Sequence, residues 1–111
     1  MRDPILKESL TSRECVIYCR VSTKQQVKGD GLRRQIQVCL DEAERLELII
    51  CGIFSEYGSD FKGKFLKARN QAEEVAKSRD CYLMFEAVDR ISRNCYIPDC
   101  KLMSVWDGLV V

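Results

Sequence analysis

With 111 residues, the chain has the length of one small domain, and its 46% hydrophobic and 32% charged residues are ordinary for a globular protein rather than a disordered one. The 18 Lys and Arg against 17 Asp and Glu leave a formal charge of +1, which gives no support for strong nonspecific binding to nucleic acid and leaves room only for a local basic site. The absence of histidine removes the commonest general base and metal ligand.

The cysteines are numerous but not arranged as a metal or redox motif. There are 7, an odd number, and no two are spaced C-x-x-C, which argues against a zinc ribbon or a dithiol redox site. We expect buried, reduced thiols at the positions that lie in or beside hydrophobic runs, which are Cys15, Cys19, Cys51 and Cys81. Reduced thiols, a polar start unlike a signal peptide and the lack of a membrane-length hydrophobic run together predict a cytoplasmic protein.

The first half of the chain alternates between hydrophobic runs and polar segments. Residues 1–13, with scattered charges, are predicted to be a flexible leader. Cys15–Val21 is predicted to be a buried strand, and residues 22–31 a polar loop that contains Gly29-Asp30-Gly31. From Leu32 to Leu46 hydrophobic residues recur every three or four positions, which predicts an amphipathic helix.

The second half repeats this pattern. Leu48–Phe54 is predicted to be a strand, followed by a glycine-containing loop over Glu56–Gly63. Phe65–Lys77 has helical periodicity, and Cys81–Val88 is predicted to be a third, mostly buried strand. The charged segment Asp89–Arg93 follows that strand at once.

A last helix is predicted from Tyr96 or Pro98 to Trp106, with proline tolerated only in its first turn and Gly108 ending it. Leu109–Val111 would then begin a fourth strand. The alternation predicts an α/β fold with three layers, in which a mostly parallel central sheet has helices on both faces. The end of the chain at this strand fits either a C-terminally truncated domain or a short edge strand at a natural terminus.

Arginines follow two of the predicted strands. Arg20 lies two residues before Ser22, so the two side chains lie on the same side at the carboxyl end of the first strand. Arg90 and Arg93 follow the third strand and share a face of one helical turn. Because parallel strands end at the same edge of a sheet, these groups predict a phosphate pocket with its own hydroxyl nucleophile. Clustered guanidiniums would bind the phosphate, stabilise charge in the transition state and favour the serine alkoxide.

The same residues also have purely structural explanations. A serine after a strand often forms a turn or caps a helix, and Asp89 with its two arginines could be a solvated helix start. No glycine-rich phosphate loop is present, since Gly29-Asp30-Gly31 lacks the third glycine of a dinucleotide fingerprint.

Three motifs and their order resemble one enzyme family. They are Tyr18-Cys19-Arg20-Val21-Ser22-Thr23 with Gln26, then Leu32-Arg33-Arg34-Gln35, and finally Val88-Asp89-Arg90-Ile91-Ser92-Arg93-Asn94. Together they closely resemble the serine recombinases, a family that includes resolvases, invertases and large serine integrases. The resemblance covers nearly the whole chain and implies that residues 14–111 form a resolvase-like catalytic domain.

The resemblance implies a specific reaction. In this family a serine attacks a DNA phosphodiester, forms a 5′-phosphoserine link and leaves a free 3′ hydroxyl, and strand exchange takes place in a tetramer. No metal or nucleotide cofactor is implied; the partners are DNA and further copies of the chain, as dimer and tetramer, with no membrane. Carried over by motif, the predicted catalytic residues are Ser22 as nucleophile, Arg20, Arg90 and Arg93 on the phosphate, Asp89 orienting the arginines, and Gln35 positioning the site. The predicted substrate-binding residues are Gln26, Glu56 and Lys64.

Two departures from the family pattern keep other hypotheses open. Lys64 stands where the family usually has an arginine, and lysine cannot bind a phosphate bidentately. The long dimerisation helix and separate DNA-binding region of the family are not in these 111 residues. The alternatives are an inactive recombinase remnant that acts only through subunit association, and an α/β protein that binds a small phosphorylated ligand.

Overall fold

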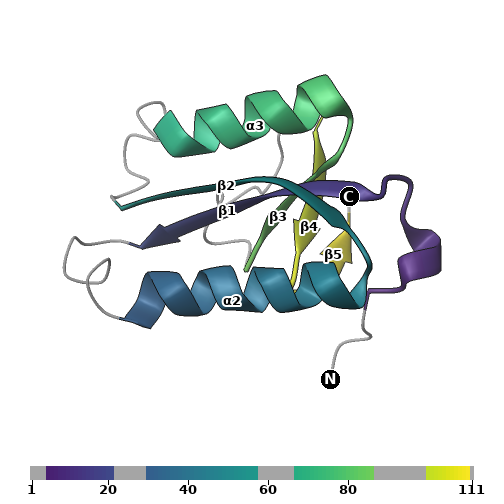
Figure 1. Ribbon diagram of the computed structural model, residues 1–111, viewed down its shortest axis with the longest axis horizontal. Coiled ribbons are helices and arrows are strands. Elements are labelled where there is room, and N and C mark those ends of the chain that lie inside the picture. Colours follow the sequence, from purple (N-terminus) through teal and green to yellow (C-terminus); the bar gives the residue numbers. More distant parts are fainter. Residues whose placement is uncertain (1–4, 22–29, 58–66, 87–99, 111) are drawn as a thin grey trace.

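The chain was analysed as a computed structural model, which describes residues 5–21, 30–57, 67–86 and 100–110 (Figure 1). In chain order its elements are the short 3-10 helix η1 (Lys7–Ser9), β1 (Glu14–Val21), α2 (Asp30–Arg45), β2 (Ile49–Tyr57), α3 (Lys67–Arg79), β3 (Tyr82–Phe85), β4 (Lys101–Ser104) and β5 (Leu109–Val110).

The described strands form one sheet in the order β2-β1-β3-β4-β5. The first four are parallel to one another, and β5 pairs antiparallel with β4. The helices α2 and α3 lie on opposite faces of the sheet (Figure 1). The predicted α/β fold with a mostly parallel sheet between helices is therefore confirmed.

Strand β1 is the centre of the core because both of its faces are covered. Cys15, Ile17 and Cys19 belong to the hydrophobic cluster under α2, whereas Val16 and Tyr18 belong to the cluster under α3. This alternation explains why the run Cys15–Val21 is hydrophobic throughout, as expected for a strand buried on both sides.

Strand β2, which pairs with β1, contains a β-bulge that shifts the register between the two strands by one residue. Cys15 pairs with Ile50 but Val16 pairs with Gly52, so Cys51 is the extra residue. From there β2 runs in register with β1 to Tyr57, which is three residues beyond the predicted end of the strand. Glu56 was predicted to lie in a loop after this strand; it lies within β2 instead.

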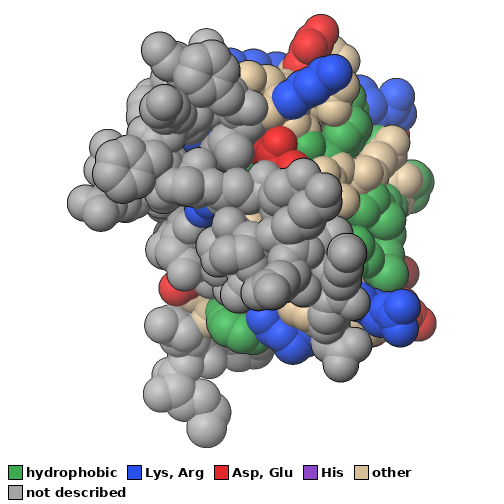
Figure 2. Space-filling model, turned by 90° about the vertical axis from the view of Figure 1, so that its left-hand side faces the viewer, with side chains coloured by type: hydrophobic (Ala, Val, Ile, Leu, Met, Phe, Trp, Pro, Cys, Tyr) green, Lys and Arg blue, Asp and Glu red, His purple; other side chains and the backbone are tan. Residues whose placement is uncertain are grey.

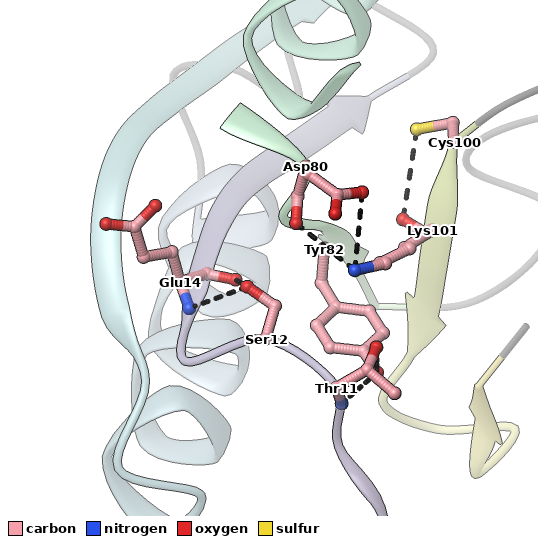
Figure 3. A network of polar contacts seen from close by, with 7 residues as sticks. All are labelled: Thr11, Ser12, Glu14, Asp80, Tyr82, Cys100 and Lys101. Atoms are coloured by element: carbon pink, nitrogen blue, oxygen red, sulfur yellow. Dashed lines mark hydrogen bonds and ion pairs between the residues drawn. The ribbon is translucent and has the colours of Figure 1, made fainter. Parts of the chain in front are cut away.

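The N-terminal segment is not a loose leader over the residues that the structure describes. Ile5 and Leu10 are buried in the cluster under α2, and the guanidinium of Arg45 donates to the Ile5 carbonyl oxygen at 2.8 Å. Thr11 N donates to the Tyr82 hydroxyl at 3.1 Å, as part of the network at the amino ends of the strands (Figure 3). The prediction failed here because two isolated hydrophobic residues in a polar segment have no periodicity that would reveal their burial.

The predicted helix ending at Trp106 is also wrong over its described part. Lys101–Ser104 is strand β4, with Leu102, Met103 and Ser104 buried in the sheet. Leucine and methionine favour helices in isolation, and a four-residue strand is too short to show a period of its own, so tertiary packing overrides the local preference. Residues 96–99 of that predicted helix lie outside the described part.

Gly108 lies in the turn of a β-hairpin and does not end a helix. Ser104 pairs with Leu109, and Gly108 has φ 62 in the turn between β4 and β5, where a residue without a Cβ is favoured. The predicted fourth parallel strand at Leu109–Val111 is therefore the antiparallel β5 over its described residues, and β4 takes the fourth parallel position.

Candidate active site

Of the nine residues predicted for the site, the structure describes Arg20, Gln35 and Glu56. The other six lie outside the described residues, and their roles stay predictions; they are Ser22, Gln26, Lys64, Asp89, Arg90 and Arg93. The described geometry therefore concerns the support of the site at the carboxyl ends of β1, β2 and β3.

Arg20 is buried, with 7% of its surface exposed, and its backbone is fixed by Gln35 from α2. The Gln35 side chain accepts from Arg20 N at 3.2 Å and donates to Arg20 O at 2.8 Å. Strand β3 pairs with β1 only over Cys15–Ile17, so the Gln35 amide satisfies backbone groups beyond the reach of that ladder. A buried glutamine thus fixes the strand end that immediately precedes Ser22 in the sequence.

Glu56 joins the end of β2 to the start of α3. Its carboxylate accepts from the Tyr18 hydroxyl at 2.7 Å, from Ala68 N at 2.9 Å and from Arg69 N at 3.1 Å. The last two donors are N–H groups of the first turn of α3, which have no partner within the helix, and a negative charge there is favoured by the helix dipole. These contacts make Glu56 a helix-capping group.

Tyr18 lies at the middle of this arrangement. It is fully buried, and burial followed by the hydrogen bond to Glu56 raises the pKa of its hydroxyl well above the usual range. The positive charges of Arg20 and Arg69 oppose that rise in pKa. Arg20 is the register partner of Glu56 on the neighbouring strand, and Tyr18 lies two residues before Arg20 on β1.

A second charged group lies at the end of β3. Glu86 is fully buried and forms an ion pair with Arg34 of α2, whose side chain is 45% exposed. The Arg34 guanidinium also lies over the ring of Trp106, 5.1 Å from its centroid. Consecutive residues of α2 thus hold two strand ends, because Arg34 contacts the end of β3 and Gln35 the end of β1.

Among the described cysteines, Cys15 and Cys81 supply no thiolate at neutral pH. Free thiols are found at all six cysteines that the structure describes, as predicted for Cys15, Cys19, Cys51 and Cys81, although Cys51 is only half-buried. Burial raises the pKa of Cys81 to about 11 and that of Cys15 to about 12. Since a thiolate is the nucleophilic form, these two protonated thiols are inert at neutral pH.

The described residues offer no cluster of His, Cys, Asp or Glu that could hold a metal ion. Among them there is also no helix long and hydrophobic enough to cross a bilayer. Figure 2 views the side of the molecule toward which the ends of β1 and β2 point; its described Lys and Arg side chains are interspersed with acidic ones rather than gathered in one patch.

Sequence reasoning missed three contributors to this region: Glu86, Arg34 and Arg69. A carboxylate inside the hydrophobic run Cys81–Val88 was a usable signal, because a charge in a buried strand requires a partner. Arg34 was visible within a motif but had no assigned role. Arg69 gave no signal, since an arginine in the first turn of an amphipathic helix is ordinary.

Comparisons with known proteins agree with this architecture. A search of curated proteins finds no match. A solved structure, the C-terminal catalytic domain of ISC1926 TnpA, described as an IS607-like serine recombinase, is similar with a TM-score of 0.64 and 22% sequence identity; the similarity covers 72% of this chain and 55% of that one. The chain thus spans about half the length of that structure, and at this identity the likeness shows the fold.

The family model for the resolvase N-terminal domain matches residues 15–103, which is most of the chain and extends from β1 into β4. The match also runs through the three motifs noted in the sequence. The chain therefore belongs to the family of resolvase N-terminal domains.

Proposed function

We propose that this chain is the catalytic domain of a site-specific DNA recombinase that cuts and rejoins DNA through a bond to Ser22. Family membership supports a recombinase-type enzyme. The observation that carries the finer proposal is the Gln35 clamp on Arg20, because it fixes the backbone of a buried arginine at the strand end two residues before the candidate nucleophile. A guanidinium near a hydroxyl suits attack on a phosphodiester.

The proposed step is a transesterification. The Ser22 hydroxyl oxygen attacks the phosphorus and loses its proton, the bond to the 3′ oxygen breaks, and that oxygen takes up a proton. The phosphoserine ester formed with the 5′ end keeps the bond energy, so the reverse attack by a 3′ hydroxyl can rejoin the strand. Arg20, with the predicted contributions of Arg90 and Arg93, would stabilise the added negative charge, and Asp89 would orient the arginines.

The test is a covalent-attachment assay with the purified chain and supercoiled plasmid. Wild-type protein is expected to nick the DNA and remain linked to its 5′ end on a denaturing gel, whereas Ser22→Ala gives no linked product. Ser55→Ala, which alters an exposed serine of β2, is the matched control and should retain attachment. Attachment by the Ser22→Ala variant would refute the mechanism.

The alternatives predict different outcomes of the same experiment. A remnant that acts only by association with other subunits gives no linked product with wild-type protein. A protein for small phosphorylated ligands would bind a mononucleotide saturably, and DNA would not compete. We also propose that the partner of this chain is DNA and that strand exchange takes place in an oligomer of the full-length protein.

A further inference from the structure

Strand β2 is an open edge of the sheet over the residues that the structure describes. There it pairs with β1 on one side only. Its 9 residues, Ile49–Tyr57, include no Lys, Arg or Pro, the residues with which edge strands often prevent pairing with another chain. The β-bulge at Cys51 lies near the start of the strand, so the edge is regular from Gly52 onward. An edge of this kind can accept a further strand.

The face of β2 on the α2 side is hydrophobic and exposed. Ile50 and Ile53 are the register partners of Cys15 and Ile17, which pack under α2. Register partners lie on the same face of a sheet, so both isoleucines lie on the α2 side. Ile50 is nevertheless 36% exposed and Ile53 45% exposed, because α2 lies over β1 and leaves much of β2 uncovered. Burying this hydrophobic surface would be favourable.

The flank of α2 on the β2 side carries opposite charges at its two ends. Arg34 pairs with Glu86 of β3, which identifies the flank of α2 that is turned away from β2. At about 100° per residue, the other flank carries Arg33 near the start of the helix, Leu40 in its second half and Glu44 near its end. Arg33 and Glu44 are exposed, and neither forms an ion pair within the described part of the chain.

The position of this flank along the sheet follows from the Gln35 clamp. Gln35 binds the backbone of Arg20, the register partner of Glu56, and α2 runs antiparallel to β1 and β2 (Figure 1). The midpoint between the two charged ends of the flank lies about 3.5 residues after Gln35, which is roughly 5 Å along the helix and about 1.5 residues back along β2. The middle of the flank is therefore level with Phe54, within the regular part of the β2 edge.

We propose that β2 pairs antiparallel with β2 of a second copy of this chain, about a two-fold axis close to Phe54. Such a contact is self-complementary and continues the sheet through both copies. It places Arg33 of each α2 opposite the partner's Glu44 and encloses the two Ile53 side chains between the two α2 helices. The inference goes beyond the chemistry proposed for Ser22 and does not depend on it.

The spacing of strands and helices allows these contacts. Because α2 lies over β1, the two α2 helices would be three strand spacings apart, or roughly 14 Å. The long side chains of Arg33 and Glu44 can span that gap, and Ile53 lies at its base. On the other face α3 packs on both β1 and β2, so the two α3 helices would approach to roughly 10 Å, a distance at which helices pack.

Charge reversal tests the antiparallel arrangement. In sedimentation equilibrium at micromolar concentrations the purified chain is expected to show a monomer–dimer equilibrium. Arg33→Glu alone and Glu44→Arg alone should each raise the dissociation constant about tenfold, because like charges then meet at two symmetry-related places. An equal mixture of the two variants should associate about as tightly as wild type, since every pair across the axis is then opposite in charge. Asp41→Arg, which reverses another exposed charge of α2, is the matched control and should stay within about threefold of wild type.

A second variant tests the strand edge itself. Ile53→Lys places a charge beside the open edge and should abolish the dimer, whereas circular dichroism should show an unchanged fold because Ile53 is half-exposed. A wild-type chain that stays monomeric would overturn the inference. So would a dimer whose dissociation constant is unaffected by Ile53→Lys and by both charge reversals, because its contact would lie elsewhere. Neither result bears on covalent attachment to DNA, so the proposed function would stand.

Discussion

Glu56 provides the sharpest test of how the site is supported. Sequence motifs assign it to substrate binding, whereas its contacts tie together Tyr18 and the first turn of α3. The Glu56→Ala substitution removes all three hydrogen bonds at once. If the contacts define its role, the variant should lose stability, and any loss of DNA affinity should follow from that.

The size of the stability loss follows from the hydrogen-bond donors that Glu56→Ala leaves without an acceptor. Loss of a capping side chain at a helix N-terminus costs about 1 kcal/mol. The hydroxyl of Tyr18, which is fully buried, would lose its acceptor, at a further cost of about 1–3 kcal/mol. The expected loss in the free energy of unfolding is therefore about 2–4 kcal/mol, which for a domain of this size lowers Tm on the order of 10 °C.

The assay is urea unfolding followed by circular dichroism, with a double-mutant cycle. Tyr18→Phe removes the hydroxyl, so adding Glu56→Ala to it should cost about 1–2 kcal/mol less than Glu56→Ala alone. Glu74→Ala, at an exposed position of α3, is the control and should change stability by under about 0.5 kcal/mol. A Glu56→Ala variant that is as stable as wild type but binds DNA poorly would refute this reasoning and support the substrate-binding role.

Three more predictions concern the other supports of the site. Arg34→Met removes the ion-pair partner of the buried Glu86 and should lower the free energy of unfolding, measured by urea titration, by about 2–3 kcal/mol. This is less than the full cost of breaking a buried pair, because Arg34 is half-exposed. A loss under about 0.5 kcal/mol would contradict the assigned pairing. Gln35→Met leaves the N–H and the carbonyl of Arg20 without their Gln35 partners, so it should lower the free energy of unfolding by about 2 kcal/mol in the same assay. It should also slow covalent attachment to DNA. Unchanged stability would show that these two hydrogen bonds are dispensable. Between about pH 9 and 11 stability should fall, because the folded chain holds protons on Cys15 and Cys81 that the unfolded chain, with thiol pKa values near 9.0, releases. Urea midpoints measured across this range should decline less in a Cys81→Ala variant, and midpoints that rise with pH would reverse the assigned direction of the pKa shifts.

The parallel sheet and its two covering helices were predictable because their signals are local. The hydrophobic run Cys15–Val21 and the periodicity from Leu32 to Leu46 identify a strand and a helix wherever they occur. Arg20 and Gln35 could be named as site residues from motifs, but only the structure shows how they meet. The amide of Gln35 reaches the backbone of Arg20 because α2 packs on the end of β1.

Short or isolated features could not be predicted in this way. Strand β4 has four residues and no period, and its burial depends on a neighbour, β3, that the local sequence does not specify. Ile5 and Leu10 are single hydrophobic residues whose burial depends on α2. The extension of β2 to Glu56 likewise depends on its pairing with β1.

The sequence by itself determined that this chain folds as an α/β domain, because hydrophobic periodicity is a property of short segments. The resemblance of its motifs to the serine recombinases indicated the resolvase type and the residues that could carry chemistry. Only the tertiary structure decided the partners of the charged groups: Glu56 with the start of α3, and Glu86 with Arg34. Arg34 and Glu86 are 52 residues apart in the chain, so their pairing arises only when a helix packs across the ends of the strands.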